Sequence, residues 1–295
     1  MIDGALLLDK PVGISSNKAL QLARQSLGAA KAGHAGTLDP LASGLLILLF
    51  GEATKFARPL LEDDKEYLAT LKLGEKTATG DAEGEVVQKR EINVEERELG
   101  PVLERFTGEI EQVPPMHSAL KRDGVPLYAL AREGKTVTRA ARRIRITELE
   151  SIELRLPYLK LRVRCSKGTY VRTLAEDIGE ALGTCAHLAA LRRTGSGRWR
   201  VEDAVSLEAL SLPSRMEHLL LLPALLGDLP RAGLDAAQEA RFRNGQSLDS
   251  FPGEGMRAVY AADGSVIGLG HVGPGGALRP LRLVSQAADK HRKTL

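Results

Sequence analysis

The chain has 295 residues, 43% of them hydrophobic, and a formal net charge of +3. This length exceeds the size at which one hydrophobic core usually keeps growing, so two domains are expected. The net charge is too small to indicate nucleic-acid binding by itself. Cys165 and Cys185 form neither a closely spaced pair nor a disulfide framework, and without closely spaced histidines they cannot complete a structural zinc site. We expect reduced thiols in a cytoplasmic protein.

The apolar runs are too short for a membrane protein. The longest, Leu219 to Leu226, is interrupted by Pro223 and falls far short of the ~20 residues that span a bilayer. The first four residues lack the basic region of a secretory signal, and only a short apolar run follows them. The sequence therefore predicts a protein that neither enters a membrane nor is secreted.

In chain order, the first two hundred residues alternate strand and helix patterns. Ala5 to Leu8 predicts a buried strand, and Ser16 to Leu27 predicts a helix with Ser16 or Asn17 as N-cap and Gly28 beyond its C-terminus. The later patterns predict a strand over 45–50, a strand over 65–73, a helix over 94–106, paired antiparallel strands over 144–156 and 158–165, and a helix over 170–182 ended by Gly183. The mixed order indicates an α+β fold built on a mixed, largely antiparallel β-sheet with flanking helices.

The pattern changes after Leu226. A short helix is predicted over Ala236 to Phe242, followed by strand-like pieces over 258–261, 265–269 and 278–283 that glycine and proline separate. Such a pattern suits a small β-rich module. We therefore expect two domains, residues 1–228 and residues 229–295.

Asp39 is the only carboxylate between Ala32 and Phe50. It follows a glycine-rich stretch and precedes the apolar run that begins at Leu45, so a rigid strand could hold its loop close to a ligand. An Asp-Pro pair by itself is a common turn signal. The surroundings of Asp39 instead favour a nucleophile that its loop holds in a fixed position.

The residues around Asp39 resemble the signature of the TruB family of tRNA pseudouridine synthases, which isomerise uridine 55 in the T arm. The signature is His34-Ala35-Gly36-Thr37-Leu38-Asp39-Pro40-Leu41-Ala42-Ser43-Gly44-Leu45. Four more segments agree in order and spacing: residues 10–16, beginning Lys10-Pro11; Lys65-Glu66-Tyr67 leading to Leu73-Gly74; residues 113–121, beginning Val113-Pro114-Pro115; and residues 165–175, which include Lys167-Gly168-Thr169-Tyr170-Val171-Arg172. Five ordered motifs over most of the first two hundred residues are highly specific.

The resemblance implies a role for each matching residue. Asp39 would be the catalytic aspartate, Arg172 its cationic partner, and Tyr67 the catalytic tyrosine that stacks on the target base and acts as, or beside, a general base. His34 would fill the gap left when the uridine is flipped out, and Leu191 would line the pocket. Lys10 and Tyr170 are assigned to substrate binding, with Lys10 supporting the active-site loop. The resemblance also implies the pseudouridine synthase fold, with a PUA-like RNA-binding domain at the C-terminus.

Pseudouridine formation breaks the bond from the ribose to N1 of uracil and rejoins the base through C5. No external group is transferred, so no cofactor and no metal are expected. Asp39 could attack the anomeric carbon, attack C6 of the uracil, or assist formation of a glycal, and the sequence does not choose among these routes. The expected partner is the T arm of tRNA, bound by a monomer.

Two other functional classes remain open at this stage. A glycosidase would usually need a second acid flanking the bond, and Asp63, Asp64 and Glu66 read as an exposed loop. A non-catalytic RNA-binding protein or folding chaperone would use basic residues and not Asp39. Three basic clusters suit RNA phosphates: Arg139, Arg142, Arg143 and Arg145; Arg162, Arg164, Lys167 and Arg172; and Arg192, Arg193, Arg198 and Arg200.

Overall fold

The computed structural model describes residues 2–118, 120–122, 124–135 and 137–285. Ala119 of the fourth motif lies outside them. The strands are β1 (Gly4–Lys10), β2 (Ala32–Ala35), β3 (Ala42–Phe50), β4 (Lys65–Leu73), β5 (Glu75–Thr77), β6 (Val86–Lys89), β7 (Gly108–Gln112), β8 (Lys121–Arg122), β9 (Val125–Pro126), β10 (Arg142–Arg155), β11 (Tyr158–Cys165), β12 (Ala186–Ser196), β13 (Trp199–Arg200), β14 (Arg231–Gly233), β15 (Gly255–Tyr260), β16 (Val266–Val272) and β17 (Leu278–Leu283). The α-helices are α1 (Ser16–Leu27), α2 (Ala57–Glu62), α3 (Glu96–Arg105), α4 (Leu127–Arg132), α5 (Val171–Ala181), α6 (Leu222–Leu225) and α7 (Ala236–Arg243), and the 3-10 helices are η1 (Gly51–Phe56), η2 (Val201–Asp203), η3 (Ala209–Ser211) and η4 (Pro213–His218).

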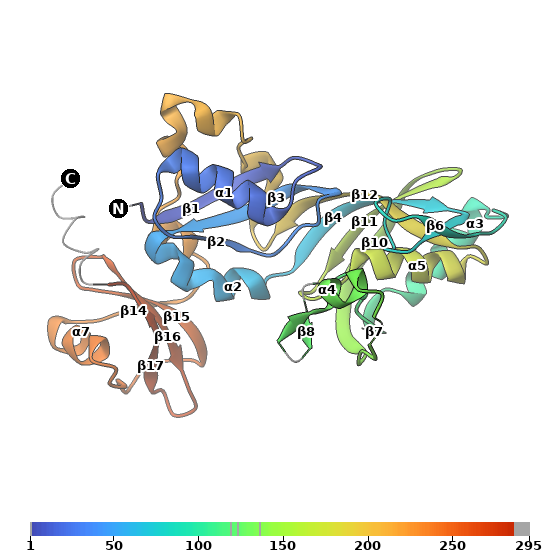
Figure 1. The fold of residues 1–295 in the computed structure, drawn as a ribbon. Coiled ribbons are helices and arrows are strands. Elements are labelled where there is room, and N and C mark those ends of the chain that lie inside the picture. Colours follow the sequence, from blue (N-terminus) through green and yellow to red (C-terminus); the bar gives the residue numbers. More distant parts are fainter. Residues whose placement is uncertain (1, 119, 123, 136, 286–295) are drawn as a thin grey trace.

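A long mixed sheet forms the body of the molecule (Figure 1). Within the described residues it has nine strands in the order β1-β3-β12-β4-β11-β10-β7, with β2 paired to β3 and β13 paired to β12. All neighbouring pairs are antiparallel except β12 with β3, which run parallel. The parallel ladder pairs Leu191 with Ala42 and Arg193 with Gly44. Strand β12 therefore joins the two halves of the sheet.

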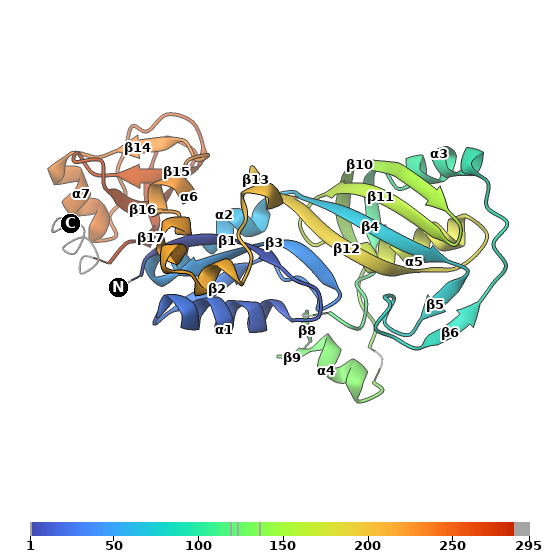
Figure 2. The ribbon, with the colours of Figure 1, turned by 90° about the horizontal axis from the view of Figure 1, so that it is seen from above.

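Both faces of the N-terminal half of the sheet are buried. On β3, Leu46, Leu48 and Phe50 pack toward α1, whereas Ile47 and Leu49 pack on the other face with η1 and α2. Figure 2 shows α1 and α2 on opposite sides of this half. Because side chains alternate along a strand, a strand covered on both faces is apolar throughout. In the other half, α5 packs beside β12, and α3 contacts β10.

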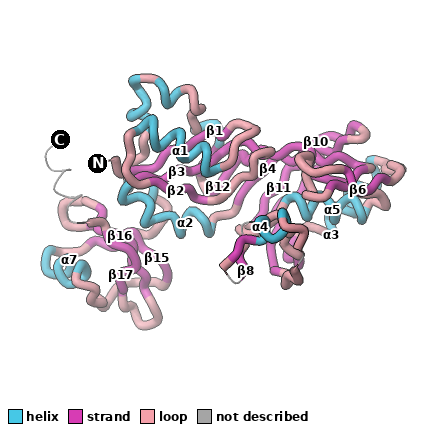
Figure 3. The backbone as a smooth tube through the Cα atoms, viewed as in Figure 1, coloured by secondary structure: helices cyan, strands magenta, loops and turns pink. Residues whose placement is uncertain are grey.

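The second half of the chain ends in a separate sheet of four described strands, β14-β15-β16-β17 (Figure 3). Its core includes Phe242 and Ile267. The opposite face joins a core that also contains Phe56 and Leu60 of the body, together with Leu269. Polar contacts close the same junction, because Lys55 donates to the carbonyl oxygen of Leu283 at 3.0 Å, and Glu52 accepts from the backbone N–H of Ser285 at 2.6 Å.

Most predicted elements are confirmed within a few residues, and the α+β class is confirmed. The strand predicted over 65–73 matches β4, and the pair predicted to turn near Pro157 is the antiparallel pair of β10 and β11. The predicted N-cap of α1 is wrong. Ser15 caps the helix by accepting from the N–H of Lys18 at 3.1 Å, because the Ser16 hydroxyl is used elsewhere. Strand β12 was not predicted.

The described helices are all short. None of them is both long enough and apolar enough to cross a membrane.

Candidate active site

Asp39 lies in the turn between β2 and β3, and neighbouring segments hold this turn on both sides. The buried Ser16 hydroxyl donates to the carbonyl oxygen of Leu38 at 2.9 Å and accepts from the Leu38 N–H at 2.7 Å. On the far side, the N–H of Gly13 donates to the carbonyl oxygen of Pro40 at 2.8 Å. The residues before and after Asp39 are therefore fixed, which fixes the direction of its side chain.

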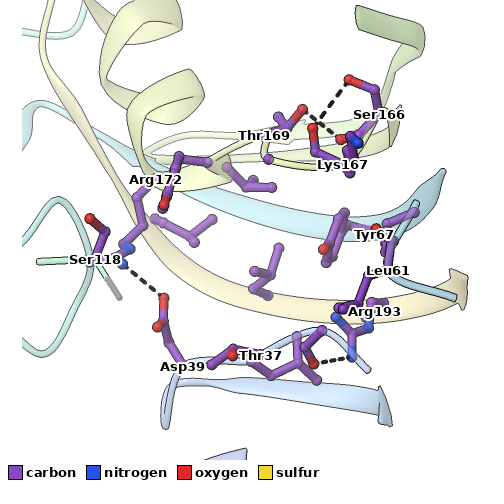
Figure 4. A pocket seen from close by; sticks show the side chains of 18 residues that line it. Thr37, Asp39, Leu61, Tyr67, Ser118, Ser166, Lys167, Thr169, Arg172 and Arg193 are labelled. Carbon is purple, nitrogen blue, oxygen red and sulfur yellow. Dashed lines mark hydrogen bonds and ion pairs between the residues drawn. The ribbon is translucent and has the colours of Figure 1, made fainter. Parts of the chain in front are cut away.

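Arg172 reaches the Asp39 carboxylate from the first turn of α5, with an Nη2–Oδ2 distance of 3.1 Å (Figure 4). The Arg172 side chain is only 8% exposed, whereas that of Asp39 is 43% exposed. Arg172 also donates to the carbonyl oxygens of His117 at 2.7 Å and Thr79 at 3.3 Å. The buried Arg172 guanidinium, fixed by several hydrogen bonds, thus holds the solvent-accessible carboxylate of Asp39.

A second carboxylate, Asp81, lies on the other side of the guanidinium. Its Oδ2 atom is 3.5 Å from Nη1 of Arg172, and its side chain is 4% exposed. Asp81 accepts from the Thr79 hydroxyl at 2.5 Å and from the Glu83 N–H at 3.1 Å. An arginine in the first turn of a helix is disfavoured by the helix dipole, so the two acids offset an otherwise unfavourable position.

The electrostatic balance on Asp39 is set by its surroundings. Burial raises the pKa of Asp39 above its ordinary value, Arg172 and Lys10 oppose the rise, and the negative charge of Asp81 adds to it. The two cations favour the ionised carboxylate, which is the form that a nucleophile needs. Asp39 is thus partly shielded from solvent, and the positive charges of Arg172 and Lys10 lie nearby.

Asp39 and Arg172 open onto a pocket of about 300 Å³. Tyr67, Tyr170 and Leu191 also line it, so the structure brings five of the predicted site residues together. Tyr67 comes from β4 and Leu191 from β12, and the described wall is completed by the loop that contains Lys167, Gly168 and Thr169. The pocket combines a flat aromatic ring, aliphatic surface and a carboxylate.

Tyr170 is placed through its backbone. The buried side chain of Gln112 accepts from the Tyr170 N–H at 2.8 Å and donates to the Tyr170 carbonyl oxygen at 3.1 Å. Ser118 lines the pocket near Arg172, and its buried hydroxyl has no partner among the described residues. A hydroxyl in that state is available to a ligand.

Lys10 and His34 do not line the pocket. Lys10 is fully buried, and its ammonium donates to the carbonyl oxygens of Pro11 at 2.8 Å and Ile14 at 2.7 Å. Burial lowers the pKa of Lys10 to about 8, against the attraction of Asp39 and Glu83. His34 lies on β2 with its Nδ1 atom buried and unpartnered among the described residues, and burial together with Arg193 lowers its pKa.

Sequence reasoning missed Asp81 and misplaced part of the basic clusters. The only local signal for Asp81 is its position in a turn that contains Thr77, Thr79 and Gly80. Arg172 and Arg193 are buried and do not belong to a phosphate-facing surface. Four other members of the clusters form ion pairs with acidic side chains: Arg162 with Glu150, Lys167 with Glu62, Arg192 with Asp9 and Arg198 with Asp228.

The described residues include no group of three or more histidine, cysteine or acidic side chains arranged to hold a metal ion. Both cysteines are buried thiols, and burial raises the pKa of Cys165 to about 11. Neither lies at the Asp39–Arg172 pair.

Comparison with solved structures identifies the fold. It matches a chain in "Crystal Structure of a Cbf5-Nop10-Gar1 Complex" with a TM-score of 0.74 at 24% identity, covering 95% of this chain and 84% of that one. A chain in "Structure of H/ACA RNP bound to a substrate RNA containing 2'-deoxyuridine" gives a TM-score of 0.72 at 23% identity, covering 96% and 85%. The chain thus shares its fold with these two chains over nearly its whole length.

Sequence comparison is more specific. Residues 24–171 match the TruB family pseudouridylate synthase N-terminal domain, residues 172–219 match the tRNA pseudouridylate synthase B C-terminal domain, and residues 230–284 match the pseudouridine synthase II TruB C-terminal region. The tRNA pseudouridine synthase B of Dechloromonas aromatica is 52% identical, with 98% of this chain and 97% of that protein covered. That of Burkholderia mallei is 53% identical, with 97% and 98% covered. The chain belongs to the TruB family of pseudouridine synthases.

Proposed function

We propose that this protein isomerises uridine 55 in the T arm of tRNA to pseudouridine. The observation that carries the proposal is the ion pair of Asp39 with the buried Arg172, because it places an accessible carboxylate in a pocket that also holds a tyrosine ring. The names of the relatives at 52% and 53% identity support tRNA as the substrate. The choice of uridine 55 and of the T arm follows from the motif resemblance.

In this proposal the target uridine leaves its stack and enters the pocket, which costs a few kcal/mol. Tyr67 stacks on the base, Leu191 contacts it, and His34 occupies the space that the base leaves in the RNA. The Asp39 carboxylate then assists cleavage of the glycosidic bond, and the base rejoins the ribose through C5. Attack on the anomeric carbon, attack on C6 and glycal formation all use a carboxylate at this position.

We also propose that the chain consists of two domains with different functions. Residues 1–228 form the catalytic domain, and residues 229–295 form a PUA-like module that binds RNA. The apolar junction through Leu269 and the contact of Lys55 with Leu283 support a fixed position of this module relative to the pocket. An enzyme acting on tRNA in this way would work in the cytoplasm, as a monomer in our proposal.

The test uses unmodified tRNA that carries tritium at C5 of uracil. Isomerisation releases tritium without cutting the chain, because C5 loses its hydrogen when the new bond forms. Free uracil would instead indicate a glycosidase, and binding without either product would indicate an RNA-binding protein.

Asp39→Asn is the decisive variant. The amide keeps the shape of the side chain and loses the charge, so turnover should vanish while RNA affinity changes little. Asp63→Asn serves as a control, because this acid does not line the pocket. Wild-type turnover in Asp39→Asn would refute the proposal.

A further inference from the structure

Arg193 is a buried arginine for which the reaction scheme above gives no role. It is 1% exposed and is among the largest fully buried side chains of the described chain. Its immediate neighbour, Arg192, forms a bidentate pair with Asp9 at 3.0 and 2.7 Å. Arg193 forms no ion pair with any residue that the structure describes. Burying a charge without an opposite charge is unfavourable, so its position needs an explanation.

The guanidinium of Arg193 connects both ends of the segment that carries Asp39. Its Nε atom donates to the carbonyl oxygen of Leu45 at 2.6 Å, and Nη2 donates to that of Gly36 at 3.2 Å. Figure 4 shows the second of these bonds at the base of the pocket. The two carbonyl groups lie on either side of Asp39 in the sequence, so one side chain closes the loop.

Two glycines of the Asp39 motif make room for this arginine. At Gly36 (φ +87°) a Cβ atom would lie 3.2 Å from Nη1 of Arg193. At Gly44 (φ +99°) it would lie 2.3 Å from the Arg193 carbonyl oxygen. The glycines thus allow the loop and β3 to approach β12 closely, which is a common use of glycine.

Arg193 also faces Tyr67. The two residues are directly paired between β12 and β4, and both line the pocket. Burial raises the pKa of Tyr67, while the positive charge of Arg193 opposes that rise. The positive charge of Arg193 beside the phenol therefore favours the deprotonated form that a general base requires.

We propose that Arg193 is a positioning residue that ties the Asp39 loop to the strand carrying Tyr67 and so sets where the Asp39 carboxylate and the Tyr67 phenol lie relative to each other. This inference rests on the proposed function, because it assumes that Tyr67 acts on the bound uridine. Arg193 would not contact the ribose or the carboxylate of Asp39. Its contribution is the relative placement of the two groups, together with a positive charge beside the phenol.

The test compares Arg193→Met with Arg193→Lys. Methionine fills space without charge, whereas lysine keeps the charge and can donate to the same carbonyl groups. We expect Arg193→Met to lower kcat by about a hundredfold or more with little change in the Kd for tRNA, and Arg193→Lys to recover most of the loss. Arg215→Met is the matched control, because Arg215 also donates to backbone carbonyl groups, those of Ser26 and Leu212, and does not line the pocket.

The pH profile separates positioning from a merely structural role. Besides Arg193, the groups whose charges act on Tyr67 are Cys165 and Asp39, and Arg193 itself acts on Lys10, His34 and Lys65 as well. In Arg193→Met the limb of the kcat profile that reports Tyr67 should move to higher pH, and in Arg193→Lys it should stay near that of the wild type. A Tyr67→Phe variant identifies this limb by its absence.

The outcomes separate the two proposals. If the wild type releases no tritium, the proposed function itself fails. If the wild type releases tritium but Arg193→Met keeps its kcat and its pH profile, the role of Arg193 is refuted. The role is refuted equally if both variants lose melting temperature and kcat in parallel with an unshifted pH profile, because Arg193 would then be structural only.

Discussion

The two sheets differ in what they bury. Among the described residues, every buried charged side chain lies between Lys10 and Arg193, in the body of the molecule. The four-stranded sheet at the C-terminal end instead buries apolar side chains such as Phe242, Ile267 and Leu269. Buried charge lowers stability unless it is compensated, so its concentration in the body marks the region where chemistry needs it. The core of the C-terminal sheet is that of a structural domain, because the described charged side chains there are not buried.

The largest effect should come from removing the positive charge of Arg172, which pairs with both Asp39 and Asp81. Arg172→Met leaves the buried Asp81 without its cation and Asp39 without its anchor. We expect turnover to fall by about a thousandfold and the free energy of unfolding to fall by about 3–5 kcal/mol. Tritium release and urea unfolding measure the two losses.

The double variant Arg172→Met/Asp81→Asn should regain stability without regaining activity, since it removes the unpaired buried charge. Arg90→Met is the control, because the exposed pair of Arg90 with Glu180 should contribute at most about 1 kcal/mol. A fully active Arg172→Met protein would break the link between buried charge and chemistry.

A core variant in α7, which packs on the C-terminal sheet, should act on stability alone. Phe242 is 0% exposed, so Phe242→Ala should lower the free energy of unfolding by about 3–5 kcal/mol through lost burial and a cavity. No charge changes, and the loss should therefore be the same at every pH where the protein folds. Urea unfolding at several pH values measures it, with the exposed Leu221→Ala as control. A strongly pH-dependent loss would contradict the contrast between the sheets.

The smallest effect concerns Lys10, whose pKa burial lowers from 10.5 to about 8. The folded protein releases this proton at lower pH than the unfolded chain, so between these values the unfolded state binds more protons and stability rises with pH. Relative to Lys10→Met, the wild type should gain about 3 kcal/mol over this interval. Parallel stability curves for the two proteins would show that the Lys10 charge is not buried in the way its contacts indicate.

The apolar strands could be predicted from the sequence because a run of apolar residues by itself indicates a strand that is buried on both faces. Residues 45–50 are continuously apolar, and β3 is buried on both faces. Strand β12 could not be predicted in this way, since Ala186–Ser196 mixes small, basic and polar residues. Its extended conformation depends on pairing with β3 and β4, which are far away in the sequence.

The site shows the same division. Asp39, Tyr67 and Arg172 lie in motifs that can be read locally, and the structure places all three around one pocket. Asp81 carries only a turn signal, and its pairing with Arg172 exists only after α5 packs on the sheet. The Ser16 hydroxyl looked like a helix cap, but it bonds the backbone of Leu38, twenty-two positions away. Such roles depend on tertiary contacts that no local pattern specifies.

The central position of β12 has a consequence for biosynthesis. A nascent chain that has left the ribosome only as far as Cys165 already contains Asp39 and Tyr67, yet it lacks Arg172, Leu191 and the strand that joins the two halves of the sheet. Domains generally fold as units during translation. The carboxylate therefore acquires its cationic partner only after more than half of the chain has been made, and products terminated before that point would carry the acid without the groups that make it useful.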